Sequence, residues 1–352
     1  MSRDIPNIKH PKGLVQIYGT IDLNQFYYRA GLSDADTVKI EITVEAVKFR
    51  PEKGARWLES LQVYNEGFIN GRPVVESDKI VVRLQGVDAP ELHYSGSRDI
   101  PENKMTAEQK RKWKNAEFRQ RWGARSTWEL TTYLNKHEKI RGSGFVEVYA
   151  FSRVDSPGDV FDIYGRFVGD IVIPAAERAD RNVNQWLVRE GWAFPTFYDS
   201  MIGDEISVLI NKGKDAMHKS KGIWQNYCQV LVPFDFNLTL PKKGKPLVDL
   251  FRDSGGLNLP KIFRRQVQFE VNHNADTTTE TTLKRYLKNS KKKDACYQTS
   301  EFMKKGTKAK KWTLDEFLDD QAKINAHPWE LIFLEKPSQL QDSNGNNIDA
   351  WY

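Results

Sequence analysis

The sequence predicts an α+β fold that is mainly β, a small closed five-stranded β-barrel of the OB type with about three helices. Two observations favour this class. Short runs in which apolar and polar residues alternate, as in half-buried strands, recur through the first two thirds of the chain. Helical spacing of apolar residues is confined to a few segments between or after these runs. Many short strands with few helices are typical of a small barrel.

The strand and helix predictions follow directly from these patterns. The segments with strand alternation are residues 15–21, 37–44, 80–84, 145–149 and 167–173. The segments with helical spacing are residues 116–134, 183–190 and 204–219. In the last of these, Ile206, Leu209 and Ile210 share one face, and Lys221-Gly222 closes the helix.

Two polar segments look like insertions between the predicted elements. Residues 49–78 contain turn signals, among them Asn70-Gly71, and predict an extra hairpin or lobe. Residues 92–114 are polar and mixed in charge, and predict a long surface loop. Loops of this length are commonly functional or mobile.

The length of 352 residues suggests about two domains. We expect a tail at 1–12, the barrel domain at 13–227 and a Pro/Gly-rich connector at 228–262. A smaller basic α/β unit, whose fold the sequence does not define, follows at 263–338, and residues 339–352 are expected to be a loose tail. Within the smaller unit we predict strands at 266–271 and 329–334. We predict helices at 282–288 and 313–326, the second capped by Thr313 with Glu316.

Composition excludes several classes of protein. No run approaches eighteen apolar residues, so a membrane-spanning helix is not expected. The two cysteines, Cys228 and Cys296, are far apart and lack partners at metal spacing, which excludes a disulfide framework or a zinc module. The first ten residues lack the apolar region of a signal peptide. We therefore expect a cytoplasmic protein, or a secreted one if the natural precursor carries a signal.

Positive charge is concentrated near the C-terminus. Residues 261–311 carry fourteen Lys or Arg and five Asp or Glu, a net charge of +9 against +6 for the whole chain. Such a segment favours a polyanion partner, nucleic acid before an anionic membrane, although a solvated lysine-rich surface is an open alternative. We expect a nucleic-acid partner, no membrane and no obligate protein partner.

The most informative segment is VVRLQGVDAPE, which ends at Glu91. It reads as a strand that the chain leaves at Gly86, followed by a turn that Pro90 fixes. Asp88 and Glu91, with Arg83 just upstream, would combine ligands for a hard cation with a phosphate-binding guanidinium. The alternative is a surface ion pair beside a proline turn.

Further motifs occur in order along the chain. They are Asp34-Ala35-Asp36-Thr37, Asp162-Ile163-Tyr164-Gly165-Arg166, VNQWLVREGWA at 183–193 and KGIW at 221–224. With the segment that ends at Glu91, this ordered set resembles the staphylococcal-nuclease-like (thermonuclease) family. The resemblance covers most of residues 13–227 and is interrupted by the two insertions.

The resemblance implies a role for each matching residue. It makes Asp36, Asp88 and the backbone carbonyl of Ala89 the ligands of a Ca²⁺ ion. Glu91 would position or deprotonate the attacking water, and Arg83 and Arg166 would bind the phosphate. The implied nucleotide-contacting side chains are Tyr164, Phe197 and Tyr198, with Phe197 where a family tyrosine stacks on a base.

This sequence departs from the family pattern at a few positions. Ala35 replaces a glycine, so the turn before Asp36 must avoid a positive φ. Ile163 replaces a lysine, which removes one phosphate contact. Phe197 keeps the ring of a tyrosine but loses its hydroxyl.

The resemblance implies a Ca²⁺-dependent, sugar-nonspecific endonuclease that hydrolyses DNA and RNA by metal-assisted attack of water and leaves 3′-phosphate ends. The alternative is a nucleic-acid-binding module that has the same barrel and does not cleave. The completeness of the site separates the two, because degenerate members lose its carboxylates or arginines. All five of these side chains are present here: Asp36, Arg83, Asp88, Glu91 and Arg166.

Overall fold

The computed structural model describes residues 13–24, 34–51, 58–59, 64, 66–94, 103, 106–108, 118–175, 181–230, 256–274, 278–290, 293–321, 323–336 and 338–348. They form two compact units, each made of separate stretches of chain. Unit 1 comprises the described parts of Asp88–Trp128 and Val188–Leu334. Unit 2 comprises those of Lys9–Val87, Glu129–Leu187 and Glu335–Tyr352. The predicted N-terminal tail and most of the predicted connector lie outside the described residues.

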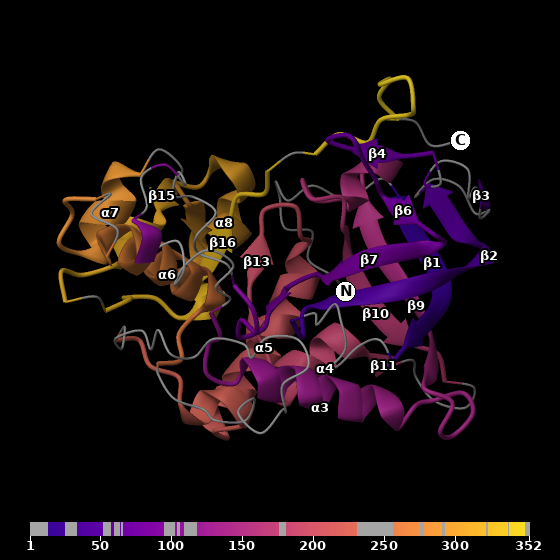
Figure 1. Ribbon diagram of the computed structural model, residues 1–352, viewed down its shortest axis with the longest axis horizontal. Helices are drawn as coiled ribbons and strands as arrows, with labels where there is room; N and C mark the ends of the chain where they lie inside the picture. The colour runs from indigo at the N-terminus through magenta and orange to yellow at the C-terminus, as the bar shows by residue number, and fades with distance from the viewer. Residues whose placement is uncertain are drawn as a thin grey trace. The chain divides into compact units, whose positions relative to one another are not determined.

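Unit 2 contains a closed barrel of five strands. The strands are β1 (Gly13–Asp22), β2 (Thr37–Pro51), β7 (Lys79–Leu84), β9 (Phe145–Val154) and β10 (Phe167–Ile173). Their order is β10-β9-β1-β2-β7, and a parallel pairing of β10 with β7 closes the ring (Figure 1). The predicted fold class is confirmed.

The barrel forms because alternate residues of each strand are apolar and point inward. On β1, Val15 and Ile17 are buried, and on β7, Ile80, Val82 and Leu84 are buried. All five predicted strands are present. Strands β2 and β9 continue beyond their predicted ends at 44 and 149, because β1 pairs with both along its length, from Gly13 onward.

The insertion at 49–78 forms the predicted extra hairpin. Strands β4 (Phe68–Ile69) and β5 (Arg72–Pro73) pair, and Asn70-Gly71 connects them with positive φ angles of 51° and 73°. Two positive φ angles are what a type I′ turn requires. Strands β3 (Leu58–Glu59) and β6 (Val75–Glu76) extend the sheet beside β2 and β7. Most of the insertion at 92–114 lies outside the described residues.

The three predicted helices of the barrel domain are present as α3 (Gly123–Asn135), α4 (Val183–Arg189) and α5 (Gly203–His218). Helix α3 begins at Gly123 rather than at 116. Trp122, the residue before it, has a φ of 69°, which cannot continue a right-handed helix. None of the helices that the structure describes is long and apolar enough to cross a membrane.

Unit 1 contains a sheet of four short strands, in the order β13-β16-β14-β15. They are β13 (Phe197–Tyr198), β16 (Leu331–Phe333), β14 (Ala295–Gln298) and β15 (Lys311–Thr313). Phe197 pairs with Ile332, so a strand from the predicted barrel domain joins strands from the predicted C-terminal unit. The two units therefore divide the chain differently from the predicted domain boundaries, which stay a prediction.

The remaining elements are short, apart from α6. They are β8 (Val87–Asp88), β11 (Arg181–Asn182), β12 (Phe194–Pro195), α6 (Pro260–Asn274), α7 (Leu283–Asn289) and α8 (Thr299–Lys305), with 3₁₀ helices at Pro157–Val160, Gly222–Gln225, Gly306–Lys308, Leu314–Phe317 and Pro328–Glu330. Helix α7 matches its prediction, and Thr282 caps it by accepting a hydrogen bond from the backbone N–H of Arg285.

Two predictions for the C-terminal part are wrong. Residues 266–271, predicted as a strand, lie inside α6, because Phe263, Val267 and Val271 are buried at helical spacing. The predicted helix at 313–326 is only the 3₁₀ turn Leu314–Phe317, with the expected capping box of Thr313 and Glu316. Leu318 then adopts an extended conformation. The predicted strand at 329–334 shortens to β16, because a 3₁₀ turn occupies its start.

The prediction of a loose C-terminal tail is also wrong for its described part. Phe68 and Gln341 exchange two backbone hydrogen bonds of 2.8 and 2.9 Å, and Leu340 is buried. The tail is therefore attached to unit 2 at Leu340 and Gln341, while residues 343–347 are exposed.

Candidate active site

Three predicted site residues, Asp36, Arg83 and Arg166, lie at one end of the barrel in unit 2. Asp36 directly precedes β2, and its carbonyl accepts a hydrogen bond from the Leu84 N–H at the end of β7 (2.8 Å). Arg83 lies opposite Thr37 in the register of β2 and β7. Ala35 is buried and is not among the described non-glycine residues with a positive φ, as the turn before Asp36 requires.

Arg166 is fixed at the same end of the barrel by the turn that precedes β10. Gly165 adopts a φ of 81°. Asp162 Oδ1 accepts hydrogen bonds from the N–H groups of Tyr164 (2.9 Å) and Arg166 (3.0 Å). Asp162 Oδ2 lies 2.8 Å from Arg166 Nε and 2.7 Å from Nη2. One carboxylate thus orders both the turn and the guanidinium.

Thr37 connects these groups. Its hydroxyl donates to Asp36 Oδ1 at 3.1 Å and accepts from Arg166 Nη1 at 3.5 Å. Within unit 2, a continuous polar chain therefore runs from Asp36 through Thr37 and Arg166 to Asp162. A carboxylate next to an oriented guanidinium is suited to binding a phosphate with a cation.

The other predicted carboxylates lie in unit 1, Asp88 at the end of β8 and Glu91 in the turn that follows. Asp88 and Glu91 are both buried, as is Ala89 between them. Gln120 holds the turn: its backbone N–H donates to the Glu91 carbonyl at 2.8 Å, and its side-chain oxygen accepts from the Glu91 N–H at 3.3 Å. Glu91 is therefore fixed at both of its backbone polar groups.

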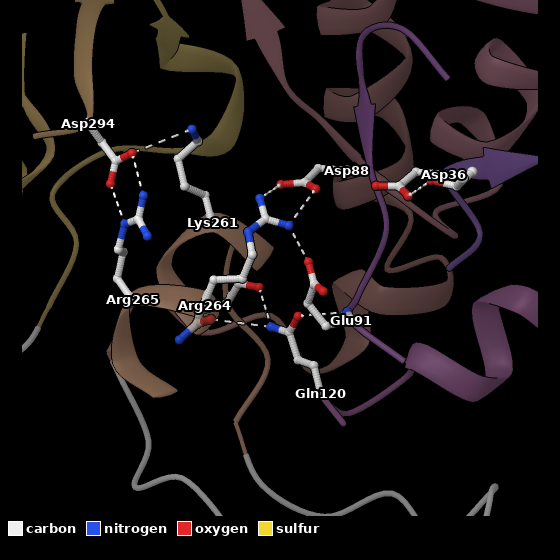
Figure 2. A network of polar contacts seen from close by, with 10 residues as sticks. Asp36, Asp88, Glu91, Gln120, Lys261, Arg264, Arg265 and Asp294 are labelled. Atoms are coloured by element: carbon white, nitrogen blue, oxygen red, sulfur yellow. Dashed lines mark hydrogen bonds and ion pairs between the residues drawn. The ribbon is translucent and has the colours of Figure 1, made fainter. Parts of the chain in front are cut away.

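A guanidinium from helix α6 binds both of these carboxylates (Figure 2). Arg264 Nη2 lies 3.4 Å from Asp88 Oδ2, and Nη1 lies 3.5 Å from Asp88 Oδ1. Nη1 also makes an ion pair with Glu91 Oε1. Asp88 and Glu91 thus contact the same guanidinium within unit 1.

Residues 81–226 match the family model described as staphylococcal nuclease homologue. This part of the chain is a staphylococcal-nuclease-like domain. The family is one of nucleases and nucleic-acid-binding proteins, so nucleic acid is the class of partner that the match supports. The search of curated proteins found no similar sequence.

The match to the family model includes most of the predicted site residues, but Asp36 and Arg264 lie outside its bounds. It includes Arg83, Asp88, Glu91 and Arg166. Asp36 and the strands β1 and β2 lie before the match, although these two strands belong to the same barrel as β7, β9 and β10. Arg264 follows it. The contact between Arg264 and the carboxylates therefore joins the domain to a segment outside the family match.

The donor atoms of the domain suit a hard cation. Carboxylate and carbonyl oxygens are the ligands that Ca²⁺ prefers. Asp88 and Glu91 offer such oxygens in a buried turn, and Asp36 offers another in unit 2. Among the residues that the structure describes, no group of three or more His, Cys, Asp and Glu side chains is arranged to hold a metal ion. The chemistry of the donors fits Ca²⁺, and the Arg264 guanidinium pairs with two of these carboxylates.

Helix α6, which carries Arg264, is anchored by a second set of charges. Arg265 Nε and Nη2 lie 2.6 and 2.8 Å from the two oxygens of Asp294, and Lys261 Nζ lies 3.8 Å from the same carboxylate. Burial acts to raise the pKa of Asp294, but the hydrogen bonds from Arg265 and the charges of Lys261 and Arg265 outweigh it, and the pKa is lowered. Asp294 is therefore a stable anionic anchor for α6.

The predicted nucleotide-contacting residues differ in exposure. Tyr164 is 63% exposed, and the Arg166 guanidinium lies 5.5 Å from its ring centre, so this ring is available for stacking. Phe197 is fully buried in β13, and the prediction that it stacks on a base is wrong. Its neighbour Tyr198 is half-buried, 6.4 Å from the Phe333 ring. The role of Tyr198 stays a prediction.

Sequence reasoning missed the residues that orient the site. Asp162 belongs to the same short motif as Arg166, and their opposite charges within one turn could have suggested an ion pair. Gln120 and Arg264 carried no such signal. Arg264 is 176 residues from Asp88 in the sequence, so only the tertiary structure brings them together.

Proposed function

We propose that this chain is a Ca²⁺-dependent, sugar-nonspecific endonuclease that hydrolyses phosphodiester bonds of DNA and RNA and leaves 3′-phosphate ends. The observation that carries this proposal is the burial of Asp88 and Glu91 around one cationic group. Buried carboxylates are costly unless a cation compensates them, which supports a role of this turn in binding a cation. The oriented Arg166 in unit 2 supports the same reaction class.

Each residue has a defined part in this mechanism. Ionised Glu91 accepts a hydrogen bond from the attacking water and aligns it with phosphorus. Arg83 and Arg166 donate hydrogen bonds to the non-bridging oxygens, on which negative charge increases as phosphorus becomes five-coordinate. The bond to the 5′-oxygen breaks, this oxygen takes a proton from solvent and leaves as a 5′-hydroxyl, and the phosphate stays on the 3′ side. A Ca²⁺ ion held by Asp36, Asp88 and the Ala89 carbonyl would polarise the phosphoryl group when bound.

A second candidate function is a nucleic-acid-binding module without cleavage. Two observations favour it: the carboxylates Asp88 and Glu91 are already paired with Arg264, and unit 1 exposes a group of lysines. These exposed lysines are Lys304, Lys305, Lys308, Lys310 and Lys311. Such a module would keep the affinity for nucleic acid and lack turnover.

The test is a cleavage assay on single-stranded DNA, duplex DNA and RNA with the wild-type chain and a Glu91→Gln variant. The proposal expects cleavage of all three substrates by the wild type and loss of turnover with retained binding in Glu91→Gln. Glu147→Gln, at an exposed glutamate on β9, is the matched control and should cleave normally. Binding by the wild type without cleavage of any substrate would favour the second candidate.

A further inference from the structure

Arg264 contacts the Asp88 oxygens that a divalent cation would need and the Glu91 carboxylate that would align the attacking water. A Ca²⁺ ion binds carboxylate oxygens at about 2.3–2.6 Å. The two terminal nitrogens of Arg264 already lie within 3.5 Å of both oxygens of Asp88, and Nη1 also contacts Glu91 Oε1. A cation and this guanidinium would therefore compete for the same lone pairs and would repel each other.

We propose that Arg264 is an internal inhibitory cation, which a divalent metal ion must displace from Asp88 and Glu91 before the domain is active. This inference rests on the proposed nuclease function. It assigns the segment after the family match a regulatory role in metal binding. The wild-type chain would then bind Ca²⁺ more weakly than the carboxylates alone allow.

The charges and the burial of the three side chains favour displacement of the arginine. Asp88 and Glu91 together carry two negative charges and Arg264 carries one positive charge, so these three side chains taken together favour the binding of a cation. The side chains of Asp88 and Glu91 are 1% and 8% exposed, whereas that of Arg264 is 25% exposed. The guanidinium can therefore move into water without leaving its own charge buried.

The contacts that anchor α6 allow the Arg264 side chain to move while the helix stays in place. Arg265 and Lys261 hold the helix to Asp294, and the Gln268 side chain donates to the Tyr94 hydroxyl at 2.8 Å. None of these contacts involves the Arg264 side chain. Helix α6 can thus stay in place in unit 1 while Arg264 exchanges Asp88 and Glu91 for solvent.

A hydrogen bond just before the start of α6 connects this segment to the turn that contains Glu91. Gln120 Nε2 donates to the Asn258 carbonyl at 2.6 Å, while Gln120 Oε1 accepts from the Glu91 N–H. Both Glu91 and the start of the α6 segment are therefore held by one buried side chain. This arrangement keeps Arg264 close to the carboxylates, so Arg264 competes with a metal ion at a high effective concentration.

The first test is calorimetric titration of CaCl₂ into the full chain of the wild type and of Arg264→Gln. We expect the affinity for Ca²⁺ to rise at least about tenfold in Arg264→Gln, because the competing charge is gone. Arg285→Gln removes the same charge from an exposed position on α7 and should leave the affinity unchanged. Equal or weaker Ca²⁺ binding by Arg264→Gln would overturn the proposal. An equal rise in Arg285→Gln would overturn it as well, by showing a general charge effect.

A second measurement uses the wild-type chain alone and so does not depend on the folding of a variant. An arginine-directed dicarbonyl reagent is applied with and without Ca²⁺, and the modified peptides are quantified by mass spectrometry. The proposal expects Arg264 to react several-fold faster with Ca²⁺, with Arg285 as the internal reference. An unchanged rate at Arg264 under saturating Ca²⁺ would overturn the displacement.

These readouts are independent of catalysis. If Arg264→Gln binds Ca²⁺ more tightly but no variant cleaves nucleic acid, the proposed nuclease function fails and the competition stands. If the wild type cleaves with Ca²⁺ but neither the affinity nor the reactivity of Arg264 changes, the nuclease function stands and the inhibitory role of Arg264 fails.

Discussion

The Asp162 carboxylate binds both the backbone N–H and the guanidinium of Arg166. Oδ1 accepts the Arg166 N–H at 3.0 Å, and Oδ2 lies 2.8 Å from Nε and 2.7 Å from Nη2. The backbone contact fixes the turn before β10, and the side-chain contacts fix the plane of the guanidinium. An arginine ordered in this way loses little conformational freedom when it binds a phosphate, which is the basis of electrostatic preorganisation.

Replacement of Arg166 should therefore impair turnover more than folding. We expect Arg166→Ala to lower kcat by about 10²–10³, the usual cost of losing one preorganised donor. Asp162→Asn should give a smaller loss, because the amide oxygen can still accept while the charge that holds the guanidinium is gone. Steady-state kinetics and thermal melting of the same preparations measure both effects.

Arg189→Ala is the control for the arginine series, since Arg189 is exposed and pairs only with its neighbour Glu190 in the contacts described. It should cleave at the wild-type rate. Near wild-type turnover by a folded Arg166→Ala would show that its assigned role is wrong.

Burial of Asp170 should make the stability of the barrel depend on pH. Burial raises the pKa of Asp170 from 3.8 to about 6, although the hydrogen bond from Asn182 and the charge of Arg153 act to lower it. Between about pH 4 and pH 6 the folded chain keeps a proton that the unfolded chain releases, so stability falls as pH rises through this window. Asp170→Asn removes this dependence and keeps an acceptor for Asn182.

Urea unfolding of the wild type and Asp170→Asn at several pH values tests this. The free energies of unfolding of the two proteins should be similar near pH 3.5. Above about pH 6 the Asp170→Asn variant should be the more stable one, by at most about 3 kcal/mol. A stability difference between the two chains that does not change with pH would contradict the raised pKa.

The strand pairing of Phe197 with Ile332 should make residues 331–333 part of the fold of unit 1. Ile332 is fully buried. Truncation of such a side chain costs about 2–5 kcal/mol, so Ile332→Ala should lower the melting temperature markedly. Val230→Ala, at a residue that is 48% exposed, should have little effect. Equal melting temperatures for Ile332→Ala and the wild type would indicate that β16 contributes little to unit 1.

The exposed lysines of unit 1 should contribute to nucleic-acid affinity through phosphate contacts. Each neutralised phosphate changes the slope of log K against log salt by about 0.7–0.9. Substitution of Lys304, Lys308 and Lys311 by Gln should therefore flatten the slope by about 2–3 if each lysine contacts a phosphate. Binding measured across a salt series gives this slope.

The control for that series removes the same charge from other exposed positions, Lys136, Lys139 and Lys219. These substitutions should flatten the slope much less. Similar slopes for the two triple variants would mean that the C-terminal lysines have no special role and form the solvated surface that composition alone left open.

The barrel was predictable because its signals are local. Alternation such as that of Ile80, Val82 and Leu84 survives in the structure, since a strand with one buried face imposes it. Helix α6 was misread for the same reason. Val267, Phe269 and Val271 also alternate, and only their spacing from the buried Phe263 distinguishes a helix from a strand.

The candidate site was predictable only where its residues are close in sequence. Asp88 and Glu91 share one turn, and Tyr164 and Arg166 share another. The burial of Phe197 follows from its pairing with Ile332, and the position of Arg264 follows from the packing of α6 in unit 1. Both depend on contacts between residues far apart in the chain, for which a single sequence has no local pattern.

The most direct test of the account is the metal dependence of cleavage by the full wild-type chain. Turnover of a single-stranded DNA substrate is measured with Ca²⁺, with Zn²⁺ and with a chelator, and binding is measured in the same samples. Because oxygen ligands suit hard cations, the account predicts cleavage with Ca²⁺, poor cleavage with Zn²⁺ and none with the chelator, while the DNA stays bound in all three. Full cleavage in the chelator, or bound DNA that no cation causes to be cleaved, would contradict it.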